Sequence, residues 1–186
     1  MPAITDAKIL LIATHGFEQS ELEFPRDQLR AKGATLHVAT PDGEAIKGWE
    51  GSDWGRDAEV DAKISDVSAD DYDALVIPGG QINPDLLRVD EDVLELVKSF
   101  HDQGKIIAAV CHAPWVLVEA GILQGRDATS YHSIKRDVIN AGANWIDEPV
   151  VVDQGIITSR QPEDLKAFVS KIVEEIEEGR HERRAA

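Results

Sequence analysis

The stretch Lys105–Val118, with the sequence KIIAAVCHAPWVLV, decides the fold of this chain. Residues 105–110 form a short apolar segment, and the residues after Cys111 predict a helix that starts at once. A strand that turns sharply into a helix holds the side chain of the turn residue out at the end of a sheet, which is the elbow geometry that presents nucleophiles. The positive end of the helix dipole there favours thiolate over thiol. We therefore expect Cys111 to be a reactive nucleophile with a lowered pKa, and a buried structural thiol is the alternative.

Outward from this junction, the alternation of apolar strands and helices continues along the chain. Unbroken apolar runs suit strands that are covered on both faces, and we expect strands at residues 8–14, 34–40, 73–77, 127–131, 150–152 and 156–158. Helical spacing predicts helices at residues 18–32 (interrupted at Pro25), 90–103, 133–141 and 162–178. Residues 44–70 are more polar and predict a short hairpin or an irregular excursion. The predicted fold class is α/β, with a mostly parallel sheet and helices on both faces.

The composition fits a single domain over residues 1–186, with a core at about 7–176 and a charged tail at 179–186. The 35 acidic and 19 basic residues give a net charge of −16, which repels phosphate backbones, so we expect no nucleic-acid partner. One cysteine cannot form an internal disulfide, and the sequence contains no targeting segment and no apolar run of bilayer length. We therefore expect a cytoplasmic protein with no membrane partner.

Ligands of parallel sheets bind outside the carboxyl ends of the strands, and three such ends carry candidate residues. Glu18 follows the first strand and is placed to exchange a hydrogen bond with Cys111, or only to complement the helix dipole. Gly79 and Gly80 end another strand and offer a backbone N–H for an oxyanion, or form only a tight turn. His112 offers its backbone N–H and, as a general base, its ring; the alternative is a solvated histidine.

The sequence favours no metal and no cofactor. His15, Glu18, Cys111, His112 and His132 show no recognised metal-ligand spacing. No glycine-rich phosphate-binding pattern is present, so a nucleotide site has no support.

Three segments resemble the PfpI intracellular cysteine protease family, which belongs to the class I glutamine-amidotransferase-like superfamily and shares it with the Parkinson-linked protein deglycase. They are GFEQSEL at residues 16–22, YDALVIPGG at 72–80 and AVCHAP at 109–114. The resemblance spans about residues 7–176 and implies a flavodoxin-like three-layer sandwich. It also implies a homodimer or a hexamer. In such an assembly Trp49 and Trp54 are candidate interface anchors, and the alternative is that their rings cap the core.

Carried over by position, the resemblance makes Cys111 the nucleophile, His112 its catalytic histidine and Glu18 the acid that hydrogen-bonds the sulfur. It makes Gly80 and the His112 backbone the oxyanion donors. In such proteases an adjacent subunit contributes an acidic residue as the third triad member. The nearest match here is Asp85, although this sequence has one extra residue between the Pro-Gly-Gly turn and Pro84. Tyr131 matches a tyrosine near the active site, and His132 is a further candidate to line the pocket.

The resemblance implies a stress-response hydrolase that acts on peptides or amides, as an intracellular protease does. A glutathione-independent glyoxalase or deglycase that acts on small aldehydes such as methylglyoxal is the first alternative. A non-enzymatic redox sensor that works by oxidation of Cys111 is the second.

Overall fold

The central sheet is built on β1 (Lys8–Ile12), whose last four residues are all buried. The computed structural model describes residues 3–179. β1 pairs in parallel with β3 (Thr35–Thr40) on one side and with β7 (Ala74–Ile77) on the other. β7 in turn pairs in parallel with β8 (Ile106–Val110), all five residues of which are buried. Strands buried on both faces explain why these sequences are continuously apolar rather than alternating.

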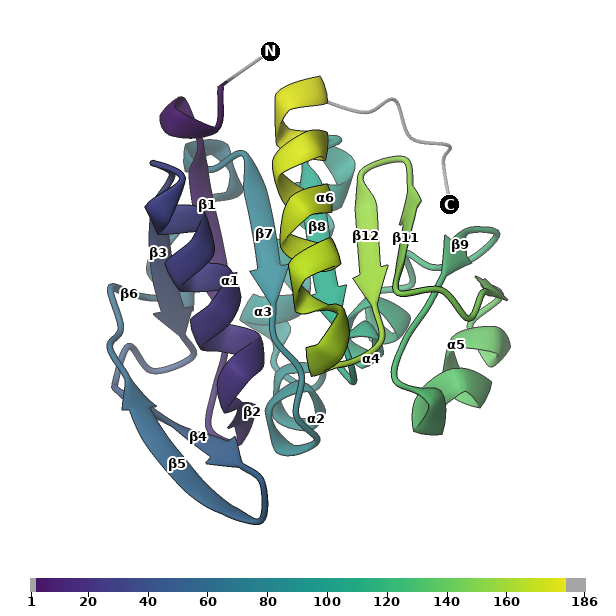
Figure 1. Ribbon diagram of the computed structural model, residues 1–186, viewed down its shortest axis with the longest axis horizontal. Helices are drawn as coiled ribbons and strands as arrows, with labels where there is room; N and C mark the ends of the chain where they lie inside the picture. Colours follow the sequence, from purple (N-terminus) through teal and green to yellow (C-terminus); the bar gives the residue numbers. More distant parts are fainter. Residues whose placement is uncertain (1–2, 180–186) are drawn as a thin grey trace.

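The sheet has seven strands in the order β11-β12-β8-β7-β1-β3-β6 (Figure 1). β12 (Ile156–Ser159) is parallel to β8, β11 (Val150–Asp153) is antiparallel to β12, and β6 is Ala62–Lys63. Two smaller sheets flank it: β2 (Phe17–Glu18) with the hairpin of β4 and β5, and β9 (Asp127–Ala128) with β10 (Asn144–Trp145). The sheet is therefore mostly parallel, as predicted.

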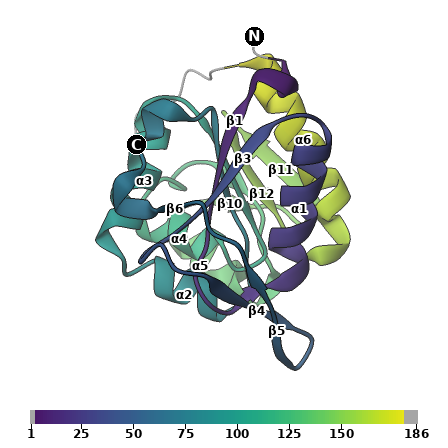
Figure 2. The ribbon, with the colours of Figure 1, turned by 90° about the vertical axis from the view of Figure 1, so that its left-hand side faces the viewer.

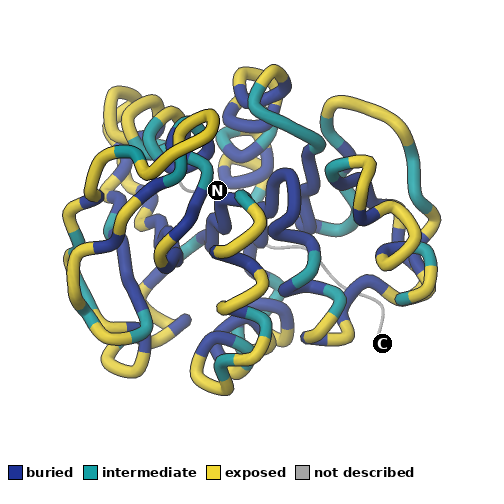
Figure 3. Tube along the Cα trace, turned by 90° about the horizontal axis from the view of Figure 1, so that it is seen from below, coloured by how far each residue is buried: buried dark blue, intermediate teal, exposed yellow. Residues whose placement is uncertain are grey.

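Helices cover both faces of the sheet, which makes a three-layer sandwich (Figure 2). α1 (Gln19–Ala31) and α6 (Leu165–Glu178) pack on one face through Leu22, Leu29, Phe168 and Ile172. α3 (Glu91–Asp102), α4 (Pro114–Glu119) and α5 (Lys135–Asn140) contribute to the core on the other face. Buried chain runs through the centre and exposed chain through the periphery (Figure 3). The flavodoxin-like class expected from the sequence is thus the observed fold.

Several local predictions need correction. α1 runs through Pro25 without interruption, although this residue has no N–H to donate to the carbonyl of Glu21. The helix after Cys111 does not start at once, because a turn precedes Pro114. α2 (Ile82–Leu87) was not predicted, since six residues are too few to show helical spacing.

The polar segment after β3 is a true hairpin of β4 (Ile46–Glu50) and β5 (Asp53–Ala58), which extends beyond the main sheet (Figure 2). Short 3₁₀ turns complete the chain at Ile4–Asp6, Ile64–Asp66, Ala69–Asp71, His132–Ile134 and Pro162–Asp164. The predicted charged tail lies, apart from Gly179, outside the described residues. Within residues 3–179, no helix is long and apolar enough to cross a membrane.

Candidate active site

Cys111 occupies a strained turn at the carboxyl end of β8. Its φ of 63° lies in the left-handed region, which among the described non-glycine residues only Gln154 shares. Hydrogen bonds fix the turn from both sides: the Cys111 N–H donates to Ser159 O at 3.0 Å, and the Tyr131 N–H donates to Cys111 O at 2.8 Å. Such strain persists only where the surroundings impose it, and it clusters at functional sites. The predicted elbow is therefore present.

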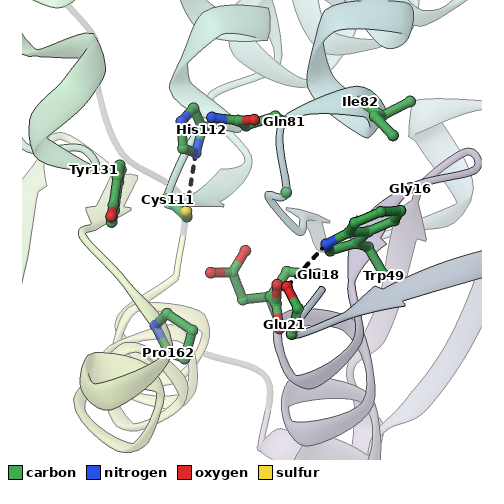
Figure 4. A pocket seen from close by; sticks show the side chains of 12 residues that line it. Gly16, Glu18, Glu21, Trp49, Gln81, Ile82, Cys111, His112, Tyr131 and Pro162 are labelled. Atoms are coloured by element: carbon green, nitrogen blue, oxygen red, sulfur yellow. Dashed lines mark hydrogen bonds between the residues drawn. The ribbon is translucent and has the colours of Figure 1, made fainter. Parts of the chain in front are cut away.

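The thiol faces a pocket of about 600 Å³ that lies below the carboxyl ends of the parallel strands (Figure 4). Cys111 is 6% exposed, so the sulfur is nearly buried but still lines this cavity. The lining residues come from six parts of the chain: Gly16, Glu18, Glu21, Trp49, Gly51, Gly80, Gln81, Ile82, Cys111, His112, Tyr131 and Pro162. The sulfur is thus not enclosed among aliphatic groups, and a small molecule in the pocket can meet it.

His112 contacts the nucleophile directly, although the two are neighbours in sequence. Its Nδ1 lies 3.1 Å from Cys111 Sγ. Burial, and then the charge of His132, lower the pKa of His112, so the ring is neutral at pH 7. A neutral ring whose Nδ1 accepts the thiol proton is placed to act as a general base.

Glu21, and not Glu18, is the carboxylic acid beside the sulfur. The Glu21 side chain is fully buried and interacts with the Cys111 thiol. Its Oε2 accepts the Gly79 N–H at 2.8 Å, while Oε1 has no hydrogen-bond partner at ordinary geometry within residues 3–179. Burial raises the pKa of Glu21 to about 8. The acid is therefore largely protonated at neutral pH, and Oε1, which accepts no hydrogen bond of ordinary geometry from the described residues, is the oxygen that can carry the proton.

The prediction of Glu18 for this role is wrong because the chain becomes helical one residue later. Glu18 is still extended, with φ −62° and ψ 121°, and pairs with Trp49 on β4. Glu21, one turn farther along, points from the start of α1 toward the end of β8 (Figure 4). Glu18 instead lines the pocket half-buried, and burial followed by the charge of Glu50 raises its pKa.

The expected lowering of the thiol pKa is also wrong. Burial, and next the charge and hydrogen bond of Glu21, raise the pKa of Cys111. The backbone N–H groups of Gly80 and His112 act in the opposite direction and do not outweigh burial. The resting site therefore holds a thiol, and ionisation of the sulfur depends on proton transfer to a neighbour.

The two backbone N–H groups predicted as oxyanion donors, those of Gly80 and His112, converge on the sulfur. Gly80 has a φ of 79°, and a Cβ there would lie 2.4 Å from Gly16 O. At Gly79 a Cβ would lie 2.4 Å from Glu21 Oε2 and 2.7 Å from Cys111 Cβ. Both glycines are required for the backbone to approach this closely. Asn83 fixes their turn by donating to Pro78 O at 2.8 Å and to Gly79 O at 3.2 Å.

Of the remaining predicted residues, only Tyr131 lines the pocket. Its ring stacks on His112 with centroids 4.9 Å apart. His132 is exposed and packs on the outer side of Tyr131, 4.3 Å between centroids. Asp85 is exposed on α2 and does not line the cavity. Its predicted role in a neighbouring copy stays a prediction.

Sequence reasoning missed Ser133, whose Oγ lies 3.1 Å from His112 Nε2. It also missed the pocket wall formed by Gln81, Ile82 and Pro162. No local pattern marks these residues, because chain segments distant in sequence bring them together. Among residues 3–179, no group of three or more His, Cys, Asp or Glu side chains is arranged to hold a metal ion.

Fold and site together define an α/β protein of the class that carries a cysteine nucleophile on a strand-to-helix elbow, with a buried acid and a histidine at the sulfur. The chain belongs to the DJ-1/PfpI family, whose family model matches residues 7–175.

Relatives and solved structures agree with this assignment. The chain is 45% identical over 161 residues (87% of this chain, 93% of the relative) to "Putative cysteine protease YraA" of Bacillus subtilis. It is 39% identical over 166 residues (89% and 97%) to "Deglycase PfpI" of Pyrococcus furiosus, and 42% identical over 163 residues (87% and 92%) to "General stress protein 18" of Bacillus subtilis. The crystal structure of Drosophila melanogaster DJ-1beta superposes with a TM-score of 0.83 at 32% identity, covering 92% of this chain and 94% of that one.

Proposed function

We propose that the protein is a stress-response hydrolase in which Cys111 attacks a carbonyl carbon. The observation that carries the proposal is the approach of His112 Nδ1 to within 3.1 Å of a sulfur that lines an open pocket. Nucleophile and base within hydrogen-bonding distance are the signature of covalent catalysis. The relatives named as a protease, a deglycase and a stress protein are compatible with it.

In the proposed first step, the thiol proton moves from Sγ to His112 Nδ1 while the sulfur bonds to the carbonyl carbon. The π-electron pair of the carbonyl moves onto its oxygen, and the N–H groups of Gly80 and His112 are the nearest donors for that charge. Protonated Glu21 donates toward the sulfur and limits the build-up of charge there.

Two substrate classes share this step. With an aldehyde such as methylglyoxal, the product is a hemithioacetal when the imidazolium returns its proton to the oxygen. A hydrogen shift between the two adjacent carbons then gives a thioester, and water hydrolyses it to a hydroxy acid. The pocket volume of about 600 Å³, with walls that include Trp49, Ile82 and Pro162, favours small substrates of this kind.

Peptide or amide cleavage is the second candidate, and 45% identity to the relative named a putative cysteine protease favours it. There the imidazolium protonates the leaving amine, the carbon–nitrogen bond breaks, and water hydrolyses the resulting acyl thioester.

A direct comparison of the two substrates tests the proposal. Consumption of methylglyoxal and cleavage of fluorogenic peptides are measured on the unaltered protein and on Cys111→Ser. We expect aldehyde turnover that Cys111→Ser abolishes. Turnover that survives Cys111→Ser would contradict the scheme. Turnover of neither substrate, with ready oxidation of Cys111 to sulfinate by peroxide, would favour the redox sensor.

We also propose that the protein acts as a homo-oligomer. Ile82, Leu86 and Val89 are 39%, 48% and 75% exposed and follow one another at helical spacing along and just past α2. This apolar stripe adjoins the pocket through Ile82, and Asp85 lies within it. Contact between copies at this stripe would cover apolar surface and bring the Asp85 of one copy toward the site of another.

A further inference from the structure

The His112 ring is held from several sides by a short segment of the same chain, Tyr131–Asp137. Tyr131 stacks on one side of the ring with an interplanar angle of 27°, and Ser133 Oγ lies 3.1 Å from Nε2. Trp115 packs against the ring at 5.3 Å between centroids, and Asp137 Oδ2 accepts its indole N–H at 2.8 Å. The segment is tied to the elbow by the bond from the Tyr131 N–H to Cys111 O. The histidine and its nucleophile are thus positioned by one local framework.

The two ring nitrogens have different partners, and this determines where the proton resides. For Nδ1 to accept the Cys111 thiol proton, a neutral ring must carry its own proton on Nε2. In that tautomer the Nε2–H has the Ser133 Oγ at 3.1 Å as a hydrogen-bond acceptor. After proton transfer from the thiol, Nε2 still carries its proton and keeps the same acceptor. The Ser133 contact therefore holds in both states of the reaction.

We infer that Ser133 is the positioning residue of the site: its hydroxyl accepts the Nε2–H of the tautomer that the Cys111 contact requires, and so completes the nucleophile–base unit within one chain. Asp85 of another copy is then not needed to orient the ring. The inference deepens the proposed function and rests on its assignment of Cys111 as the nucleophile.

A hydroxyl at this position differs from a carboxylate in its electrostatic effect. It accepts the N–H but adds no negative charge, so it does not stabilise the imidazolium. The lowered pKa of His112 fits such an environment. The titratable and charged groups nearest the ring are Cys111 with Glu21 beside it, Tyr131, His132 and, beyond Trp115, Asp137 and Arg88.

The test uses the rate at which iodoacetamide alkylates Cys111 across pH, which needs no substrate. Failure of every candidate substrate therefore leaves this test intact. Ser133→Ala removes the acceptor, Ser133→Thr retains a hydroxyl, and Asp85→Asn removes the carboxylate in question. Ser133 and Asp85 are both exposed, so the variants are expected to fold, and melting curves verify this.

For Ser133→Ala we expect alkylation near pH 7 to slow by about fivefold to tenfold. The loss of one hydrogen bond lowers the fraction of His112 rings that carry their proton on Nε2 by about that factor. The difference should vanish at high pH, where the thiolate forms without the histidine. Ser133→Thr and Asp85→Asn should follow the unaltered protein. Nitrogen-15 NMR of labelled histidine should show the neutral His112 ring protonated on Nε2 in the unaltered protein. In Ser133→Ala it should show a mixture of the Nε2-protonated and Nδ1-protonated tautomers.

An unchanged alkylation profile in Ser133→Ala would overturn the inference. So would a loss of the same size in Asp85→Asn, because the ring would then depend on a carboxylate from a second copy. A His112 protonated on Nδ1 in the unaltered protein would overturn it as well.

Discussion

Cys111 and Glu21 are two acids in contact, and both side chains are almost fully buried at the base of the pocket. Glu21 is the second cause, after burial, of the raised pKa of Cys111. In Glu21→Gln, the amide oxygen can still accept the Gly79 N–H, and the amide carries no charge. We expect the pH dependence of Cys111 alkylation to shift to lower pH by roughly one unit. A profile that coincides with that of the unaltered protein would show that Glu21 does not act on the sulfur.

The same residue makes a prediction about stability. The pKa of Glu21 is about 8 in the folded protein against 4.5 ordinarily, so the folded state keeps a proton that the unfolded chain loses. The stabilisation is complete below about pH 4.5 and is lost as the pH rises toward 8. Urea unfolding from pH 4.5 to 8.5 should show the free energy of unfolding of the unaltered protein falling relative to Glu21→Gln. The fall should reach a few kcal/mol, since one pKa unit corresponds to about 1.4 kcal/mol. A constant difference between the two proteins would rule out the raised pKa.

At the scale of elements, the turn after β7 depends on Gly80. With φ at 79° and Gly16 O, Glu18 N and Phe17 C all within 3.1 Å of an added Cβ, Gly80→Ala adds a backbone clash to conformational strain. We expect a loss of about 3 kcal/mol or more in unfolding free energy. Gly121→Ala is the matched control, because Gly121 has a φ of 73° and nothing within 4 Å of its Cβ position. For Gly121→Ala we expect the unfolding free energy to fall by about 1 kcal/mol, because only the backbone strain is added. Equal losses would mean that the turn after β7 does not lie against the backbone of residues 16–18.

The elbow at the end of β8 makes a second prediction at this scale. Glycine tolerates the φ of 63° at Cys111, and alanine does not. Replacing alanine by glycine normally destabilises an element by about 1 kcal/mol. We expect the reverse order here: thermal unfolding should show Cys111→Gly to be at least as stable as Cys111→Ala. A clearly less stable glycine variant would indicate that the elbow is unstrained.

For the whole molecule, the apolar stripe of Ile82, Leu86 and Val89 locates the proposed contact between copies. A Leu86→Glu and Val89→Glu double variant should dissociate the oligomer in sedimentation or light-scattering measurements, since charges at a covered apolar contact lack partners. Trp54→Glu is the comparison, because Trp54 is also a large exposed apolar residue, 46% accessible, but lies on the β5 hairpin. Dissociation by Trp54→Glu alone would place the contact at the hairpin instead.

Most of the fold could be predicted from the sequence because its signals are local. The runs that became β1, β7 and β8 are apolar on both faces, and this by itself requires helices on either side. α2 gave no such signal: it is one and a half turns long, and its exposed side is apolar. Pro25 misled the prediction because tertiary packing of α1 outweighs one lost hydrogen bond.

The sequence by itself determined the sheet, the elbow and the place of Cys111 on it, since a buried strand, a turn and a helix in succession are properties of adjacent residues. Only the tertiary structure decided which glutamate meets the sulfur, whether the thiol is ionised, and which group faces the far nitrogen of His112. Glu18 and Glu21 are the same residue type, three positions apart. Glu18 is still extended and Glu21 lies in the first turn of α1, so their side chains point in different directions. Ser133 reaches His112 from 21 residues away, and the pKa of Cys111 depends on how much water the folded chain excludes. Those quantities come from packing between segments, which no local pattern records.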